Sequence, residues 1–350
     1  MKRKTQYIRA VMLEQISDFS KISPKNVAEK FGVSRQAIFK NLRELIKTGI
    51  VEKTNDAKRP YSLKAIKNSY VTIEVTKDTS EDKIWNEIAV PLLNEEKENV
   101  RAICHYGFTE MFNNVIDHSG SNRASMWINV DALVARIGIT DYGVGIWNKL
   151  QEAFHLDDQR HALLELTKGK LTTDPKRHTG EGIFFTSRMF NKYLIASDKL
   201  TFCRFQQGDE WLFDVSESDA KTDPGTRISM IVYRDSKTTP QEVFDKFTDD
   251  LSEFGFTRTQ VSVYLAKYEG DHLVSRSQAK RIMNRLDKFK EVYLDFKDVT
   301  EIGQGFADEI FRVFQQEHPG IKLIPINTAP SVLQMILRAR AGEGQTELPI

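Results

Sequence analysis

Two side chains with hard oxygen atoms stand out in the stretch 97–118 by their type and spacing. Glu110 and Asn114 lie four residues apart in a segment whose apolar positions predict a helix, so both fall on one helical face. A carboxylate can act as a general base toward water, and an amide oxygen suits Mg²⁺. By itself such a pair is more typical of a solvated helix face, so the interpretation depends on the residues that follow.

Two glycine-rich turns and a threonine follow this helix along the chain. Asp141, Gly143 and Gly145 come directly after a strand predicted over 133–140. Glycines let a backbone approach a ligand closely, and the amides at a helix N-terminus can hold phosphate. The second turn, which opens a helix, and the start of a later strand supply Thr179, Gly180, Gly182 and Thr226.

The order and spacing of these segments resemble the four nucleotide motifs of the gyrase, MutL and histidine-kinase ATPase superfamily (GHKL), over roughly residues 70–235. The resemblance implies an α/β-sandwich (Bergerat) domain with ATP and Mg²⁺ as cofactors. It puts Asp141 at the adenine amino group, Thr226 at a water beside the base, Asn114 at Mg²⁺ and Glu110 in the role of general base. The nucleotide-binding residues that it implies are Asn114, Asp141, Gly143, Gly145, Lys176, Thr179, Gly180, Gly182 and Thr226.

The polar stretch 151–178 separates the two turns, and the resemblance makes it a lid over the phosphates. Its positive charge would come from Lys168, Lys170, Lys176, Arg177 and His178. Sensor histidine kinases usually carry Asn at the position of Glu110, so this residue favours the hydrolysing ATPases or the anti-sigma serine kinases. His105 and His118, on the same predicted helix, are interpreted as local hydrogen-bonding groups rather than phosphoacceptors.

Residues 1–65 predict three helices followed by a β-hairpin. Ser23 and Pro24 start the second helix, Gly32 ends it, and Ser34 caps the third. The pattern resembles a winged helix-turn-helix, which inserts its third helix into the major groove. A solvated basic face or a protein contact is the alternative. The residues that would bind DNA are Arg35, Gln36, Lys40 and Arg43 on the helix and Lys58 and Arg59 at the hairpin tip.

The distribution of charge supports a polyanionic partner for this N-terminal unit. Residues 1–64 hold 15 Lys and Arg against 6 Asp and Glu, a net charge of +9. Because the whole chain is +1, the remaining residues sum to −8. A basic unit joined to a mildly acidic remainder predicts double-stranded DNA as a partner.

Residues 260–340 predict a smaller α/β unit that resembles STAS-like domains. The resemblance rests on the strand 292–296, on Val299 and Ile302, and on the helix that starts at Phe306. Proteins of the anti-anti-sigma type carry a phosphorylatable Ser in the turn before this helix. Here the turn is Gly303-Gln304-Gly305 and has no hydroxyl group, which argues against a serine switch. A dimer module, a protein-binding scaffold and a ligand sensor all stay open.

The sequence therefore predicts a multidomain α/β protein. Its parts are a winged helix-turn-helix (1–65), an ATP-binding domain (66–235), a connecting helical segment (236–259), a STAS-like domain (260–340) and a loose tail (341–350). No run of 18 apolar residues exists and no apolar stretch follows the basic start, so neither a membrane span nor a signal peptide is expected. Cys104 and Cys203 are expected to be reduced, buried thiols, as in a cytoplasmic protein.

The predicted function is that of an ATP-switched, DNA-associated regulator that is expected to hydrolyse ATP and in which lid closure alters domain or dimer contacts. Two alternatives stay open at this point. One is an anti-sigma-type serine kinase that acts on a separate partner. The other is an ATPase effector of a defence system that acts on foreign DNA.

Overall fold

The N-terminal unit consists of three helices and a hairpin, as predicted. The computed structural model describes residues 2–19, 21–176, 178–205, 210–214, 224–249, 255–267 and 272–341. Gly32 ends the second helix in the left-handed conformation (φ 57°), and the Ser34 hydroxyl accepts a hydrogen bond from the Ala37 amide at 3.2 Å. The elements of this unit are α1 (Lys2–Phe19), α2 (Pro24–Phe31), α3 (Arg35–Lys47), β1 (Val51–Lys53) and β2 (Tyr61–Leu63).

The central unit is built on a seven-stranded sheet in which all neighbouring strands are antiparallel, in the order β3-β4-β5-β9-β6-β7-β8. The sequence predicted three strands after the second glycine-rich turn, whereas the structure has four. Two of them, β6 and β7, form a hairpin with a two-residue turn at 198–199. The strands are β3 (Lys67–Glu74), β4 (Arg123–Val130), β5 (Val134–Asp141), β6 (Lys192–Ser197), β7 (Leu200–Phe205), β8 (Glu210–Asp214) and β9 (Thr226–Tyr233).

Helices cover one face of this sheet, and α6 (Glu98–His118) is the longest of them. Its buried residues recur every three or four positions, which forms the apolar stripe that packs against β5 and β9. Gly107 lets the helix approach Phe190, since a Cβ atom there would lie 2.4 Å from the phenyl ring. The other helical segments of this unit are α4 (Glu81–Ile84), a π-turn at Trp85–Ala89, α5 (Val90–Leu93), α7 (Ile146–Phe154), α8 (Gln159–Lys168) and α9 (Gly182–Met189).

The prediction of a polar lid over 151–178 is wrong for most of its length. Residues up to 168 form the end of α7 and the whole of α8. Asp158 caps α8, because its carboxylate accepts a hydrogen bond from the His161 amide at 2.8 Å. Leu163 and Leu164 are fully buried. Apolar residues set among polar ones therefore make α8 part of the core, and within this stretch the residues 155–158 and the described residues after 168 lie outside regular helices and strands.

The C-terminal unit contains a three-stranded parallel sheet in the order β10-β11-β12. Parallel neighbours need crossover connections, and helices provide them here. The helix predicted over 278–289 ends early, at Met283, and continues only as a short 3₁₀ turn. The strands are β10 (Arg258–Ser262), β11 (Glu291–Asp295) and β12 (Lys322–Ile326), and the helices are α11 (Arg276–Met283), α12 (Gln304–Asp308), α13 (Gln315–Glu317) and α14 (Pro330–Ala341). Three shorter segments complete it, namely 3₁₀ turns at Val263–Ala266 and Leu286–Lys288 and a π-turn at Glu309–Phe314.

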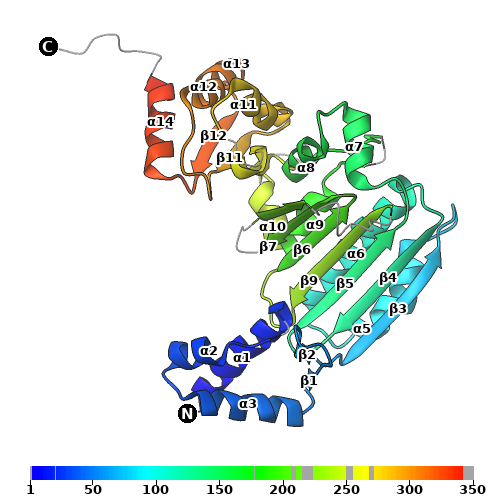
Figure 1. Ribbon diagram of the computed structural model, residues 1–350. Helices are drawn as coiled ribbons and strands as arrows, with labels where there is room; N and C mark the ends of the chain where they lie inside the picture. The colour runs from blue at the N-terminus through cyan, green and yellow to red at the C-terminus, as the bar shows by residue number, and fades with distance from the viewer. Residues whose placement is uncertain are drawn as a thin grey trace.

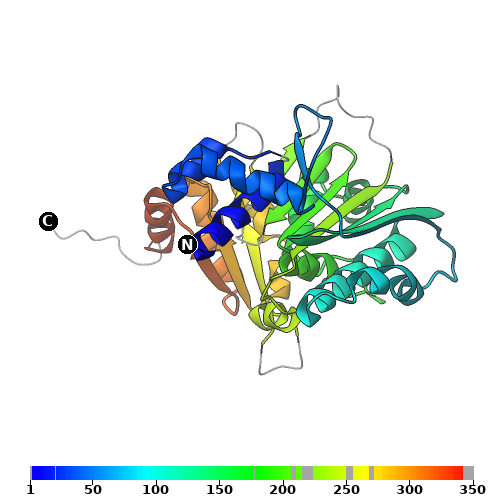
Figure 2. The same cartoon turned by 90° about the horizontal axis from the view of Figure 1, so that it is seen from below.

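The central and C-terminal units share one hydrophobic core, whereas the N-terminal unit has a core of its own. The connecting segment predicted over 236–259 contains the helix α10 (Pro240–Phe247). Phe256 joins the two units, since its ring lies 4.5 Å from that of Phe184 and 5.2 Å from that of Phe289. In Figures 1 and 2 the N-terminal unit lies at one end of the large sheet, and in Figure 1 the C-terminal unit lies beside α8 and α10.

The chain thus has the predicted mixed α/β, multidomain character. None of the described helices is both long and apolar enough to cross a membrane. Both cysteines are free thiols: Cys104 is buried as expected, while Cys203 on β7 is only half-buried. Residues 342–350, the predicted tail, lie outside the described part of the chain.

Candidate functional site

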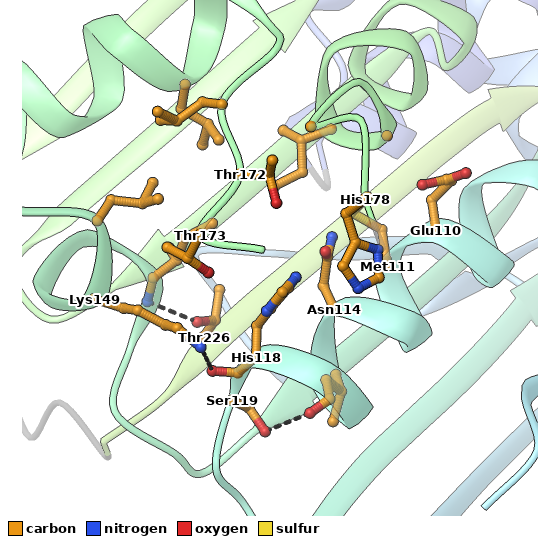
Figure 3. A pocket seen from close by; sticks show the side chains of 18 of the residues that line it. Glu110, Met111, Asn114, His118, Ser119, Lys149, Thr172, Thr173, His178 and Thr226 are labelled. Carbon is orange, nitrogen blue, oxygen red and sulfur yellow. Dashed lines mark hydrogen bonds between the residues drawn. The ribbon is translucent and has the colours of Figure 1, made fainter. Parts of the chain in front are cut away.

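One cavity of about 280 Å³ brings together residues that are up to 118 positions apart in the sequence, from Glu110 to Ile228. It lies among α6, the two glycine-rich turns and the first residues of β9 (Figure 3). Its walls are mainly apolar, and polar groups converge at a few points, as is usual in sites for small molecules. The predicted residues that line it are Glu110, Asn114, Asp141, Gly145, Thr179, Gly180, Gly182 and Thr226.

Asp141 and Thr226 form a fixed polar group at one end of this cavity. Asp141 is buried, and its Oδ1 accepts a hydrogen bond from the Gly143 amide at 2.9 Å. Thr226 Oγ1 accepts one from the Ile146 amide at 3.1 Å. Burial raises the pKa of Asp141, while hydrogen bonds from Gly143 and Thr226 lower it in part. The arrangement presents a carboxylate in an apolar setting, where it can accept a hydrogen bond from a ligand.

Gly143 supports the site without lining it. A Cβ atom at this position would lie 1.9 Å from the carbonyl oxygen of Ser119, which follows α6. Because that contact involves backbone, only glycine lets the turn sit against the end of α6. The sequence therefore identified a necessary residue but assigned it to ligand contact instead of packing.

Glu110 and Gly182 lie against each other at another edge of the cavity. A Cβ atom on Gly182 would lie 2.0 Å from Glu110 Oε2, so the glycine leaves room for the carboxylate. Burial, and then the nearby Glu181 carboxylate, raise the pKa of Glu110. Figure 3 shows Asn114 grouped with His118 and His178, and Glu110 farther along α6. A half-buried carboxylate with a raised pKa is a suitable proton acceptor near neutral pH.

A basic group completes the lining, and the sequence did not assign most of it. Lys149 on α7 lines the cavity and donates a hydrogen bond from Nζ to the His118 carbonyl at 2.6 Å. His178 Nε2 lies 3.2 Å from Asp117 Oδ2, and its ring is 4.8 Å from that of His118. Burial, followed by Lys149 and His178, lowers the pKa of His118. The sequence did contain a sign that Lys149 lines the cavity. This lysine lies about one helical turn after Gly145, which places it on the same side of the helix as the first glycine-rich turn.

Three of the lysines predicted to carry lid charge lie elsewhere. Lys168 is fully buried and pairs with Glu165 at 2.6 Å. Lys170 donates a hydrogen bond to the Lys288 carbonyl at 2.9 Å. Lys176 is exposed and does not line the cavity, so its predicted nucleotide contact is not reproduced. Arg177, which was also predicted to carry lid charge, lies outside the described residues.

The buried lysine ties the wall of the cavity to the C-terminal unit. Lys168 Nζ donates hydrogen bonds to the carbonyls of Arg281 at 2.8 Å and Asn284 at 3.0 Å. Glu165 Oε2 lies 3.1 Å from Arg285 Nη1, and Thr259 Oγ1 donates to the Lys168 carbonyl at 2.7 Å. Two residues of the same segment, Leu166 and Leu171, line the cavity. A movement of this segment would therefore change contacts both in the cavity and with the C-terminal unit.

The residues predicted to contact DNA share one property: all are exposed in the structure. Those on α3 lie on the side opposite its buried residues, with Arg35 and Gln36 in its first turn. Lys58 lies at the hairpin tip, where its amide donates a hydrogen bond to Asp56 Oδ1 at 2.8 Å. The full set of exposed residues is Arg35, Gln36, Lys40, Arg43, Lys58 and Arg59.

Comparisons with known proteins bear on the C-terminal unit. A family model described as a STAS-like domain of unknown function (DUF4325) matches residues 278–333. No curated protein matches the chain. A crystal structure described as the IcIR transcriptional regulator from Alicyclobacillus acidocaldarius is 14% identical, covering 68% of this chain and 91% of that one, with a TM-score of 0.22. That score is too low to support an argument about fold. The C-terminal unit thus contains a STAS-like domain, as its sequence predicted.

Proposed function

We propose that the central unit binds Mg²⁺-ATP in the cavity between α6 and the glycine-rich turns. The observation that carries this proposal is the convergence of four separated motifs on one cavity, with Asp141 at one end and Asn114 within it. Asp141 would accept the adenine amino proton, and the apolar side chains of Met111, Ile146 and Ile183 would enclose the base. Asn114 Oδ1 would ligate Mg²⁺, which prefers hard oxygen ligands.

The basic group supports the same orientation of the nucleotide. His118, Lys149 and His178 line the same cavity as Asn114, and their N–H groups could donate hydrogen bonds to a phosphate chain. Gly180 and Gly182 precede or begin α9, whose N-terminal amides suit an anion. Glu110 would accept the proton of an attacking water, which makes hydrolysis the proposed reaction.

The raised pKa of Glu110 makes the pH dependence of turnover a test of its role. A general base must be ionised, so kcat/KM should fall as the pH drops through a pKa above that of an ordinary glutamate. Glu181→Gln removes the second-largest cause of the shift and should move this acid limb to lower pH. The measurement is steady-state phosphate release from pH 5 to pH 9. An acid limb at the same pH in both proteins would mean that Glu110 does not control it.

We further propose that nucleotide occupancy regulates DNA binding by the N-terminal unit. Strand β5 supports a physical link, because it carries Asp141 at one end and Arg136 near the other. Arg136 Nη2 donates a hydrogen bond to Ser17 Oγ on α1 at 2.9 Å, and Lys192 pairs with Asp18 on the same helix. The alternatives, a serine kinase and a DNA-directed defence effector, use the same cavity. Transfer of label from ATP to a protein, instead of release of phosphate, would favour the kinase.

The DNA proposal predicts binding that weakens steeply with salt. Each phosphate neutralised by Lys or Arg releases counterions. The logarithm of the affinity should therefore fall linearly with the logarithm of the salt concentration, with a slope set by the number of phosphate contacts. Reversing Lys58 and Arg59 to Glu should weaken binding to all duplexes alike, whereas Arg35→Ala or Gln36→Ala should relax sequence preference. The measurement is a fluorescence titration of duplex DNA at several salt concentrations, with and without Mg²⁺-ATP. Absence of binding at low salt would assign this unit to protein contact, and identical titrations with and without nucleotide would contradict the switch.

A further inference from the structure

A second cavity, of about 580 Å³, lies at the junction of the central and C-terminal units. It shares no lining residue with the cavity proposed for ATP. On one side it is bounded by α9, β7 and α10, and on the other by the strands β10 and β11 and the turn after β12. The carboxyl ends of parallel strands are a common place for ligands. The lining residues used below are Arg188, Arg204, Glu242, Lys246, Asp295 and Asn327.

Arg188 is a buried cation with no carboxylate partner. Its side chain is only 7% exposed, and among the described residues no acidic oxygen lies within ion-pair distance of it. The guanidinium stacks on the Phe184 ring at 3.4 Å and donates hydrogen bonds to the carbonyls of Phe184 at 3.2 Å and Gln260 at 3.3 Å. Its Nε–H has no partner. Burial, and then Arg204, lower the pKa of Arg188, while the Glu210 carboxylate raises it in part.

Arg188 shares its nearest carboxylate with a second cation. Arg204 is also buried, and it pairs with Glu210 at 3.2 Å. Three acids line the cavity, Glu242, Asp295 and Asp298. Asp295 accepts hydrogen bonds from Gln260 and Asn327, each at 2.9 Å, and Glu242 accepts one from the Thr239 amide at 3.0 Å. Glu210 is thus the carboxylate next to both buried guanidinium groups, while Lys246 and Lys297 add two further cations to the lining.

The backbone around the cavity has a second unusual feature. Asp298 and Asn327 line it from the turns that follow β11 and β12, and both adopt left-handed conformations, with φ of 61° and 53°. Such conformations are uncommon for residues other than glycine, although Asn and Asp tolerate them best. They recur where a turn must present its groups in a fixed direction. Here both turns are directed at the same cavity.

We propose that this cavity binds a small anion with a phosphate or carboxylate group, held by Arg188 together with Arg204 and Lys246. The anion would accept a hydrogen bond from the unpartnered Nε of Arg188 and place a further negative charge beside the two guanidinium groups, and it would connect α9 and β7 with the C-terminal unit. Arg188 lies on α9, whose first residues, Gly182 and Ile183, line the other cavity. The site would therefore make the docking of the STAS-like domain sensitive to a metabolite. It does not depend on ATP binding by the central unit.

The test is the thermal unfolding midpoint of the full-length protein, titrated with inorganic phosphate at constant ionic strength. Sulfate and malonate in parallel series distinguish a tetrahedral oxyanion from a carboxylate. A ligand that binds only the folded state raises the midpoint with the logarithm of 1 + L/Kd, where L is the free ligand concentration, here by about 2–4 °C at a tenfold excess over its dissociation constant. General stabilisation by excluded salts is the same in all variants, so the ligand-specific rise is the part that depends on the lining residues of the cavity.

Arg188→Met should abolish the ligand-specific rise, and the exposed Arg338→Met should retain it. If Arg188→Met does not fold, Lys246→Met at the exposed rim should need a several-fold higher anion concentration for the same rise. The rise should persist in Asp141→Asn, and its loss there would mean that the anion occupies the other cavity and would overturn the proposal. An equal rise in wild type and Arg188→Met with all three anions would also overturn it.

Discussion

Replacing Glu110 with Gln should reduce ATP turnover by about 10²–10⁴-fold, because the amide cannot accept the proton of the attacking water. The change keeps the shape of a side chain whose carboxylate fits against Gly182, so the cavity should survive. Nucleotide affinity should stay within a factor of a few, since Asp141 and Asn114 are untouched. Single-turnover phosphate release and calorimetry on the same protein measure the two effects separately.

A matched control for this variant is Glu181→Gln, the neighbouring carboxylate. It should alter the pH dependence but keep turnover at its optimum near the wild-type value. Equal turnover in Glu110→Gln and wild type would remove Glu110 from the role of base. Loss of nucleotide binding in Glu110→Gln would instead show that this carboxylate holds the site together.

The second large effect is expected at the junction of the central and C-terminal units. Lys168→Met leaves Glu165 with Arg285 at 3.1 Å and the side-chain amide of Asn284 at 3.2 Å, and it removes the donor to the carbonyls of Arg281 and Asn284. Breaking a buried pair by deleting one partner costs about 3–5 kcal/mol of unfolding free energy. The lower end of this range is expected here, because Arg285 still pairs with Glu165. Urea unfolding of the full chain measures the loss.

Lys40→Met on the exposed face of α3 is the control, and it should change the unfolding free energy by less than about 0.5 kcal/mol. A loss below about 1 kcal/mol for Lys168→Met would mean that the cluster does not hold the two units together. Since Leu166 and Leu171 line the cavity on either side of Lys168, the variant should also weaken ATP binding. Unchanged affinity would separate the junction from the nucleotide site.

Features governed by local physics could be predicted from the sequence. The caps at Ser34 and Gly32, and the apolar period of α6, depend on residues within a turn of each other, so their patterns are visible in the chain. The need for glycine in the two turns could also be predicted from the sequence. Backbone occupies the space of a side chain at Gly143, and a carboxylate occupies it at Gly182, so only glycine fits at these positions.

The environment of the lysines could not be predicted in the same way. Lys168 looks like a lid cation in the sequence, but two of its three acceptors are carbonyls of residues more than 110 positions away. Arg188 lies in a stretch that reads as an ordinary helix, and its burial depends on Phe184 together with a strand of the C-terminal unit. Polar residues surround the leucines of 151–168, so the sequence did not show that these leucines make α8 part of the core. Burial created by contact between two units leaves no local pattern.

The most direct test of the central claim is calorimetry of Mg²⁺-ATP with the wild-type chain and Asp141→Asn. An amide at this buried position presents a donor where the adenine amino group requires an acceptor, at a cost of about 1–3 kcal/mol. The account predicts one ATP site per chain in the wild type and an affinity about 5–150-fold weaker in the variant. Equal affinity of the two proteins, or no heat of binding with the wild type, would contradict it.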